Sequence, residues 1–208
     1  MPETIRQSPL HDLLQTAPLP GGAIQAKRLR RVGLCDVSLL EKLGLKGPGA
    51  AMWLGDLGLA VPADVYASGP LEAGGLVVRL GVNEFLLEAG SPDRSLTPLR
   101  EALPGDSAQL VPVVREDATL LLCGLRALDL LAQCCGYDFS RSPSARLVYT
   151  RIAGVSCGIL PQQVGGNPVY RIWFDPSYAI YLWETLAEIA DGLGGGAVDA
   201  AAIFAKSH

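Results

Sequence analysis

Two groups of residues in this sequence stand out as candidates for acid–base or nucleophilic chemistry. Asp36 lies inside the apolar run Val32–Val37, where a carboxylate with a raised pKa can act as a general base. Cys135 and Asp138 can place a reactive thiol beside a carboxylate. The plainer interpretations are more common: a hydrogen-bonded turn for Asp36, and a buried thiol at a helix end with Asp138 capping the next turn.

Aromatic and metal-binding residues give a second set of candidates. Trp53, Trp173 and Trp183 can stack on a ring system, although the spacing of Trp183 along a predicted helix favours the core or a subunit contact. No Gly-x-Gly-x-x-Gly lies between a strand and a helix, so we do not expect the chain itself to bind FAD, FMN or NAD. The cysteines form no Cys-x-x-Cys pair, and only His11 and His208 could assist them, so we expect no metal site.

The composition narrows the classes of partner. Hydrophobic residues make up 49% of the 208 residues, charged residues only 18%, and the mean hydropathy is +0.28. No uncharged apolar run approaches the ~18 residues that span a bilayer, and no secretory signal is visible, so we expect apolar surface in an oligomeric or subunit interface. A net charge of −4 does not favour binding to the negatively charged backbone of a nucleic acid. The five cysteines favour free thiols in the cytoplasm.

The elements that must position these residues alternate between strands and helices. Two apolar runs, Val32–Val37 and Leu43–Leu45, precede a helix opened by Pro48. Residues 76–80 and 85–88 predict a hairpin, and the three- and four-residue spacing over 96–103 predicts a helix. In the second half we expect paired strands at 110–114 and 119–123 around Arg115-Glu116-Asp117, followed by a helix at 125–135. Three further strands are expected at 146–152, 155–160 and 169–174. Asp175 is expected to cap the last helix, whose apolar stripe is Tyr178, Tyr181, Leu182, Leu186 and Ile189.

This order predicts an α+β fold of two small lobes, each a largely antiparallel sheet with helices on one face. We expect an N-terminal arm at residues 1–22, a first lobe at 23–104, a second, ferredoxin-like lobe at 105–195, and a tail at 196–208.

The residues also carry a family resemblance. Gly33-Leu34-Cys35-Asp36-Val37-Ser38, followed by Gly47-Pro48-Gly49-Ala50-Ala51, resembles the glycine-cleavage T-protein (aminomethyltransferase) family. In that family an Asp-Val-Ser strand precedes a second strand and a Gly-Pro-x-Ala-Ala helix start. The segments 120–131 and 170–186 resemble its strand–Gly–helix and late strand–helix units. The resemblance implies the T-protein folate-binding fold, here without its C-terminal barrel.

The gamma subunit of heterotetrameric sarcosine oxidase resembles the chain in length and in three further segments. These are a Leu-Gly-x-Asn/Asp-Glu-x-Leu-Leu segment at 80–87, a Cys-x-x-Asp at Cys135 to Asp138, and a Ser-Tyr/Phe-Ala start at 177–179. The resemblance runs from about residue 9 to residue 195.

The family's catalytic residues find weak counterparts. T-proteins carry an Asn-Asp pair after the Gly-Pro-x-Ala-Ala helix, and its Asp assists methylene transfer to tetrahydrofolate. Asp64 is the candidate here but follows Ala63, and Asp56 is an alternative. The folate-lining Arg-Thr-Gly-Tyr-Thr-Gly-Glu loop is reduced to Arg151–Ser156 without its acidic residue. Arg151 could hold a pterin or a glutamate tail, or form an ion pair at a strand edge. Glu84 and Trp53 are further candidates for folate contact.

The resemblance therefore implies a scaffold whose catalytic positions have drifted. We expect a non-catalytic gamma-like subunit of a sarcosine oxidase-type complex that oxidises secondary or tertiary amines. FAD, FMN or NAD would lie on its larger flavoprotein partners, with self-association as another route to oligomers. The alternative is a standalone tetrahydrofolate-dependent aminomethyltransferase with Asp64 or Asp36 near the reactive nitrogen, or a folate-binding protein.

Overall fold

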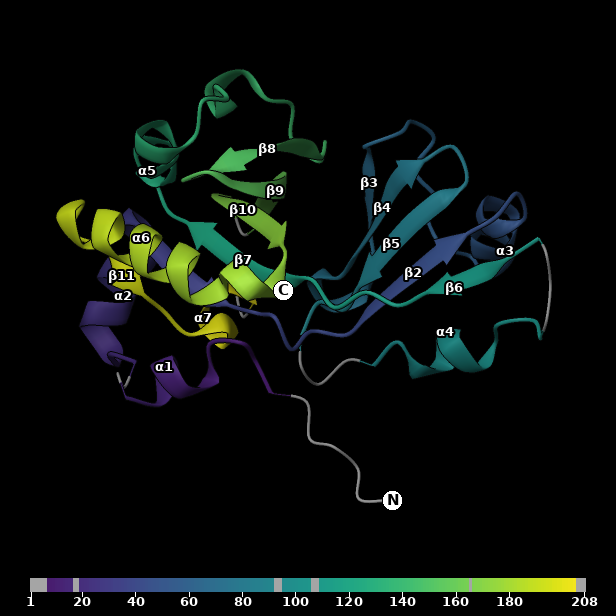
Figure 1. The fold of residues 1–208 in the computed structure, drawn as a ribbon, viewed down its shortest axis with the longest axis horizontal. Coiled ribbons are helices and arrows are strands. Elements are labelled where there is room, and N and C mark those ends of the chain that lie inside the picture. The colour runs from purple at the N-terminus through teal and green to yellow at the C-terminus, as the bar shows by residue number, and fades with distance from the viewer. Residues whose placement is uncertain (1–6, 17–18, 92–94, 106–108, 165, 205–208) are drawn as a thin grey trace.

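Two sheets, each with its own helices, make up the molecule (Figure 1). The computed structural model describes residues 7–16, 19–91, 95–105, 109–164 and 166–204. The α+β architecture with two largely antiparallel sheets is as predicted. The pairing of β1 with β11 is parallel, and the other described strand pairs are antiparallel.

The first sheet has six strands, and neither of its faces is open along the central strands. In spatial order the strands are β11 (Gly196–Ala197), β1 (Gly33–Asp36), β7 (Ala118–Cys123), β10 (Asn167–Phe174), β9 (Val155–Val164) and β8 (Val148–Ile152). All six residues of β7 are buried because alternate side chains meet different neighbours. Leu120 and Leu122 pack with the helices α5 (Ala127–Cys134) and α6 (Ala179–Gly192), whereas Leu121 and Cys123 pack with α7 (Ala200–Phe204).

The second sheet has five strands and one helix-covered face. In spatial order its strands are β3 (Ser68–Pro70), β4 (Leu76–Gly81), β5 (Glu84–Glu88), β2 (Lys42–Lys46) and β6 (Val111–Val113). Leu43, Leu45 and Phe85 share a core with Leu54 of α3 (Ala50–Asp56) and with Leu99 of α4 (Thr97–Glu101).

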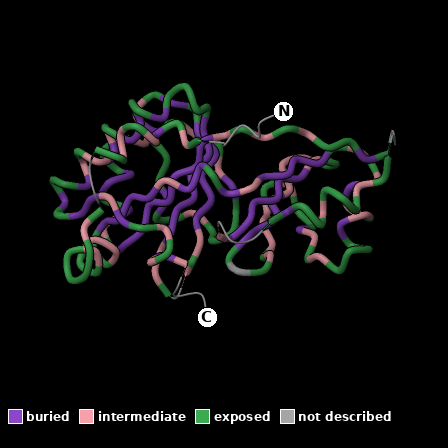
Figure 2. The backbone as a smooth tube through the Cα atoms, turned by 90° about the horizontal axis from the view of Figure 1, so that it is seen from below, coloured by how far each residue is buried: buried purple, intermediate pink, exposed green. Residues whose placement is uncertain are grey.

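The sheets meet through the face of the five-stranded sheet that no described helix covers and through part of the six-stranded sheet's α7 face. Leu76, Val78 and Leu86 of the five-stranded sheet pack against Leu160 and Trp173 of the six-stranded sheet. Buried backbone therefore continues from one sheet into the other (Figure 2).

The remaining helices lie at the periphery. They are α1 (His11–Gln15), α2 (Gly22–Arg31) and the 3₁₀ turns η1 (Glu72–Gly74), η2 (Phe139–Arg141) and η3 (Pro176–Tyr178). The longest described helix, α6, has 14 residues, and none of the described helices has the length and apolar character of a membrane span.

The expectation that segments 110–114 and 119–123 pair with each other is wrong. β6 pairs with β2 in the five-stranded sheet, whereas β7 lies between β1 and β10 in the six-stranded sheet. Residues 114–117 form no turn but run from one sheet to the other. The chain makes the same kind of passage earlier, between β1 and β2. The division expected at residues 104–105 therefore does not coincide with the separation of the sheets.

The predicted apolar stripe of α6 is only partly right. Asp175 does accept a hydrogen bond from the backbone N–H of Ser177, 2.9 Å away, and so caps the η3 turn that leads into α6. Leu182 and Leu186 are buried, but Tyr178 and Tyr181 are about half exposed. Trp183 and the small residues Ala179 and Ala190 occupy the buried face instead.

Candidate functional site

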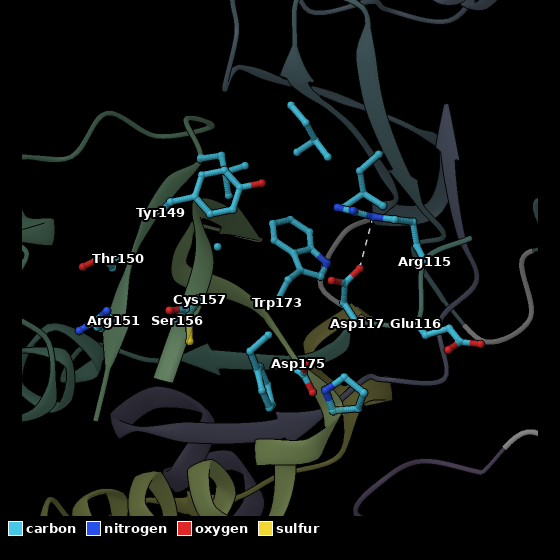
Figure 3. Close-up of a pocket in the computed structure, with 16 residues that line it drawn as sticks. Arg115, Glu116, Asp117, Tyr149, Thr150, Arg151, Ser156, Cys157, Trp173 and Asp175 are labelled. Atoms are coloured by element: carbon cyan, nitrogen blue, oxygen red, sulfur yellow. Dashed lines mark ion pairs between the residues drawn. The ribbon is translucent and has the colours of Figure 1, made fainter. Parts of the chain in front are cut away.

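A cavity of about 740 Å³ lies where the two sheets meet (Figure 3). Its walls come from the end of β4, the middle of β5, the passage 115–117, the β8–β9 hairpin and the end of β10. Both sheets and one of the passages between them are therefore needed to form it. A site built from such distant segments is rigid only if the contact between the sheets is rigid.

The polar wall of the cavity is an ion pair on the passage. Nε of Arg115 lies 3.3 Å from Oδ2 of Asp117, and both side chains are about three-quarters buried. Neither of these two atoms makes a well-aligned hydrogen bond among the described residues. The pair presents both a cation and an anion to the cavity, so it suits a ligand or a protein side chain with polar groups.

The aromatic wall of the cavity faces that ion pair. Tyr149 and Trp173 point toward Arg115 and Asp117 (Figure 3). The Tyr149 ring packs edge-on against Tyr66, with 5.7 Å between ring centroids. Partial burial raises the pKa of the Tyr149 hydroxyl, and the Arg115 guanidinium opposes that shift. The phenol therefore stays protonated at neutral pH and can donate a hydrogen bond.

A buried carboxylate holds Trp173 in place. The Trp173 indole Nε1 donates to Oε2 of Glu88 at 2.6 Å, and the Thr119 hydroxyl donates to the same oxygen at 3.3 Å. Arg171, two residues before Trp173 on β10, forms an ion pair with Oε1 of Glu88. Glu88 is fully buried, so the aromatic wall is fixed by charge-assisted hydrogen bonds rather than by packing alone.

A second cation completes this cluster. Nζ of Lys42 lies 3.6 Å from Oε2 of Glu88 and donates to the carbonyl oxygens of Ser38 and Leu40 at 3.2 and 3.4 Å. Glu88 and Lys42 face each other across β5 and β2, whereas Arg171 comes from the other sheet. The cluster of Lys42, Glu88 and Arg171 therefore fastens the two sheets directly beneath the cavity.

The end of β10 supplies another carboxylate, Asp175. Hydrogen bonds from the hydroxyl and the backbone N–H of Ser177 lower the pKa of Asp175. The Asp175 carboxylate is therefore ionised at neutral pH and accepts hydrogen bonds as the cap of η3. On the opposite wall, burial raises the pKa of the Cys157 thiol to about 12. Cys157 is thus an unreactive apolar side chain at neutral pH.

Of the candidates predicted from sequence, two line the cavity: Arg151, on the edge strand β8, and Trp173, near the end of β10. Asp36 lies elsewhere and accepts hydrogen bonds from the hydroxyls of Ser8 and Ser38, the latter at 2.6 Å. Asp64 is exposed at a bend and is not part of the cavity wall.

The other candidates lie outside the cavity as well. Glu84 begins β5 and lies 3.8 Å from Lys46. Trp53 packs with the core of the five-stranded sheet, and Asp56 is exposed at the end of α3. The structure thus brings none of these residues together with Arg151.

Cys135 and Asp138 also lie apart from the cavity. The Cys135 sulfur is 3.8 Å from the Thr150 hydroxyl, and Asp138 caps η2 by accepting from the backbone N–H of Ser140 at 3.0 Å. All five cysteines are free thiols. The described part of the chain holds no group of three or more His, Cys, Asp or Glu side chains placed to bind a metal.

Sequence reasoning missed Arg115, Asp117, Tyr149 and the cluster of Lys42, Glu88 and Arg171. One signal was present: Arg171 interrupts an otherwise apolar strand, Lys42 begins another and Glu88 ends a third. A charged side chain within a buried apolar strand is stable only when a group of opposite charge is buried beside it.

Comparison with known proteins gives consistent results. A family model described as the GCVT N-terminal domain matches residues 25–203. An aminomethyltransferase from Moorella thermoacetica is 28% identical over an aligned length of 182 residues, and the match covers 81% of this chain and 49% of that protein. The chain thus spans about half the length of this curated relative.

Two solved structures share the fold. A chain of heterotetrameric sarcosine oxidase from Corynebacterium sp. U-96, in complex with pyrrole 2-carboxylate, has a TM-score of 0.69 and 24% identity, covering 94% of this chain and all of that chain. Aminomethyltransferase T of the glycine cleavage system from Bartonella henselae has the same TM-score and 19% identity, covering 94% of this chain and 60% of that chain. The same arrangement of two sheets therefore occurs in an oxidase complex and in a transferase.

Proposed function

The chain belongs to the GCVT N-terminal domain family, and on that basis we propose that it is a non-catalytic, gamma-like subunit of a sarcosine oxidase-type complex in the cytoplasm. Such a complex oxidises secondary or tertiary amines in a folate-linked reaction. In this role the chain supports flavin-carrying partner subunits and supplies no reacting group of its own.

The observation that carries the proposal is the state of the carboxylates around the cavity. Asp117 is paired with Arg115, Asp175 accepts from Ser177, and Glu88 is surrounded by donors. The Glu116 side chain points away from Trp173 (Figure 3). Asp117, Asp175 and Glu88 are thus each engaged by other groups of the chain, which makes them poor acceptors for a proton from an amine.

A solved relative gives independent support for a subunit role. One protein that shares this fold is a chain of a heterotetramer. Several large hydrophobic residues of the chain are at least 70% exposed, but they are scattered over loops, α3 and the turn before α5 and form no contiguous patch. They are Met52, Val82, Val114 and Leu125. Single exposed side chains of this kind are common on protein surfaces, so the support comes from the shared fold.

The direct test is reconstitution with flavoprotein subunits of an amine oxidase. We expect the chain to co-elute with flavin absorbance at fixed stoichiometry, and amine oxidation to require the flavoprotein. The isolated chain should show no oxidation of sarcosine. Oxidation by the isolated chain, or a monomer that never joins the flavoprotein, would contradict the proposal.

The cavity itself supports one alternative, a tetrahydrofolate-binding protein or aminomethyltransferase. Tyr149 and Trp173 offer aromatic faces, and Arg151 lies beside them on β8. Calorimetric titration of the isolated chain with tetrahydrofolate separates the two proposals. Binding that is lost in Arg151→Ala but kept in Arg146→Ala, an exposed arginine that does not line the cavity, would favour this alternative.

A further inference from the structure

Helix α2 is ten residues long and has no buried residue. An isolated helix of this length is marginal in water, so packing must stabilise it. Within the described chain that packing is slight: Leu29 is partly buried against the core beneath α7, while Ile24 is 58% exposed. Arg28 and Arg31 hold the helix in place by donating to the carbonyl oxygens of Ala197 and Leu193 at 3.0 and 2.6 Å.

A groove of about 540 Å³ runs between α2 and the start of α5, at the end of the molecule farthest from the five-stranded sheet (Figure 1). Its apolar lining consists of Ala23, Ala26 and Leu125, and the Leu125 side chain is 73% exposed. Its charged lining consists of Lys27, Arg30, Arg31 and Arg126. We call these seven residues the basic groove.

The positive charge of the basic groove is poorly compensated. Asp129 lies beside the groove but forms an ion pair with Arg126, with 2.7 Å between Oδ2 of Asp129 and Nε of Arg126. Lys27 and Arg30 are exposed, and among the described residues neither side chain has an ion pair or a hydrogen bond. This is a concentration of cations in a chain whose net charge is −4. Symmetric contact between two copies through this face would bring like charges together.

We infer that the basic groove is the docking surface for an acidic segment of a partner polypeptide, with apolar side chains that cover Leu125 and Ile24. This rests on the proposed function, in which the partner is a flavoprotein subunit. A free small anion fits the surface less well, because exposed lysine and arginine side chains hold such ions weakly in water. A segment that covers the apolar lining also excludes water, and the cations then attract its carboxylates more strongly.

The test uses the full chain and a fluorescent synthetic peptide that alternates glutamate with leucine. Anisotropy should show binding that weakens as salt rises. The double variant Lys27→Glu/Arg30→Glu should bind at least tenfold more weakly. The matched control is Arg141→Glu/Arg146→Glu, which changes net charge equally at two exposed arginines outside the groove and should bind like wild type.

Other outcomes would overturn the inference. These are equal losses in both double variants, no salt-dependent binding to wild type, displacement by millimolar inorganic phosphate, or self-association through the groove. A second arm with the flavoprotein separates this inference from the proposed function. If the complex forms as tightly with Lys27→Glu/Arg30→Glu as with wild type, the docking surface is wrong and the function stands. If wild type binds the peptide through the groove but never joins the flavoprotein, the function is wrong.

Discussion

Replacing Glu88 by glutamine tests whether the cluster of Lys42, Glu88 and Arg171 fastens the two sheets. Glutamine has nearly the same shape and can still accept from the Trp173 indole, so the change removes mainly charge. It leaves two cations, both at most 2% exposed, without their anion. Removing one partner of a buried ion pair costs about 3–5 kcal/mol.

That cost corresponds to a large shift in the thermal midpoint. A domain of this size loses roughly 2–4 °C of Tm for each kcal/mol, so Glu88→Gln should melt about 6–20 °C below wild type. Differential scanning calorimetry and urea unfolding, followed by circular dichroism, measure the loss of unfolding free energy. Tryptophan fluorescence follows the same unfolding, with contributions from Trp53, Trp173 and Trp183.

Lys42→Met is the matched control for this prediction. It removes one of the two cations and leaves Glu88 paired with Arg171 alone, so it should cost less than Glu88→Gln, about 1–2 kcal/mol for the hydrogen bonds lost at two carbonyl groups. The reasoning is refuted if Glu88→Gln lies within about 1 kcal/mol of wild type, or if Lys42→Met is the more damaging change.

Three further predictions concern the surroundings of the cavity. Asp175→Ala should lower Tm at pH 7, because Ser177 lowers the pKa of Asp175 in the folded state. The difference in Tm from wild type should fade as pH falls below about 4, which Tm measurements across pH would show. The Cys157 thiol, with a pKa of about 12, should resist iodoacetamide at pH 8 in the folded protein and react after unfolding, as mass spectrometry of digests can establish; rapid native labelling would contradict its burial. Gly44→Ala should cost about 1–3 kcal/mol, since its Cβ would lie 2.7 Å from a β6 carbonyl oxygen, whereas Gly55→Ala in α3 meets nothing within 4 Å and should leave urea stability equal or higher.

The strands and helices were largely predictable, because their signals are local. The run Val32–Val37 and the Pro48 helix start predict β1 and α3, and the hairpin 76–88 appears as β4 and β5. The assignment of strands to sheets was not predictable in the same way. β6 and β7 are both apolar and close in sequence, so nothing local shows that one pairs with β2 and the other with β1 and β10.

The same limit applies to the cavity. Arg151 could be proposed because family resemblance marks its loop, but Arg115 and Asp117 occupied an expected turn. They gain their role only because that segment passes between the sheets beside Tyr149. Lys42, Glu88 and Arg171 are far apart in sequence, and their meeting depends on the register of β2 with β5 and on the packing of one sheet against the other. Local patterns carry no information on such register.

The two passages of the chain, from β1 to β2 and from β6 to β7, have a consequence for fragments of this protein. A cut between residues 104 and 105 would leave the N-terminal piece holding β1, a strand of the other piece's sheet. The C-terminal piece would hold β6, which the N-terminal piece needs. Each fragment would expose an open strand edge that matches a strand of the other. The halves are therefore complementary rather than independent, and they should recombine as split reporters do.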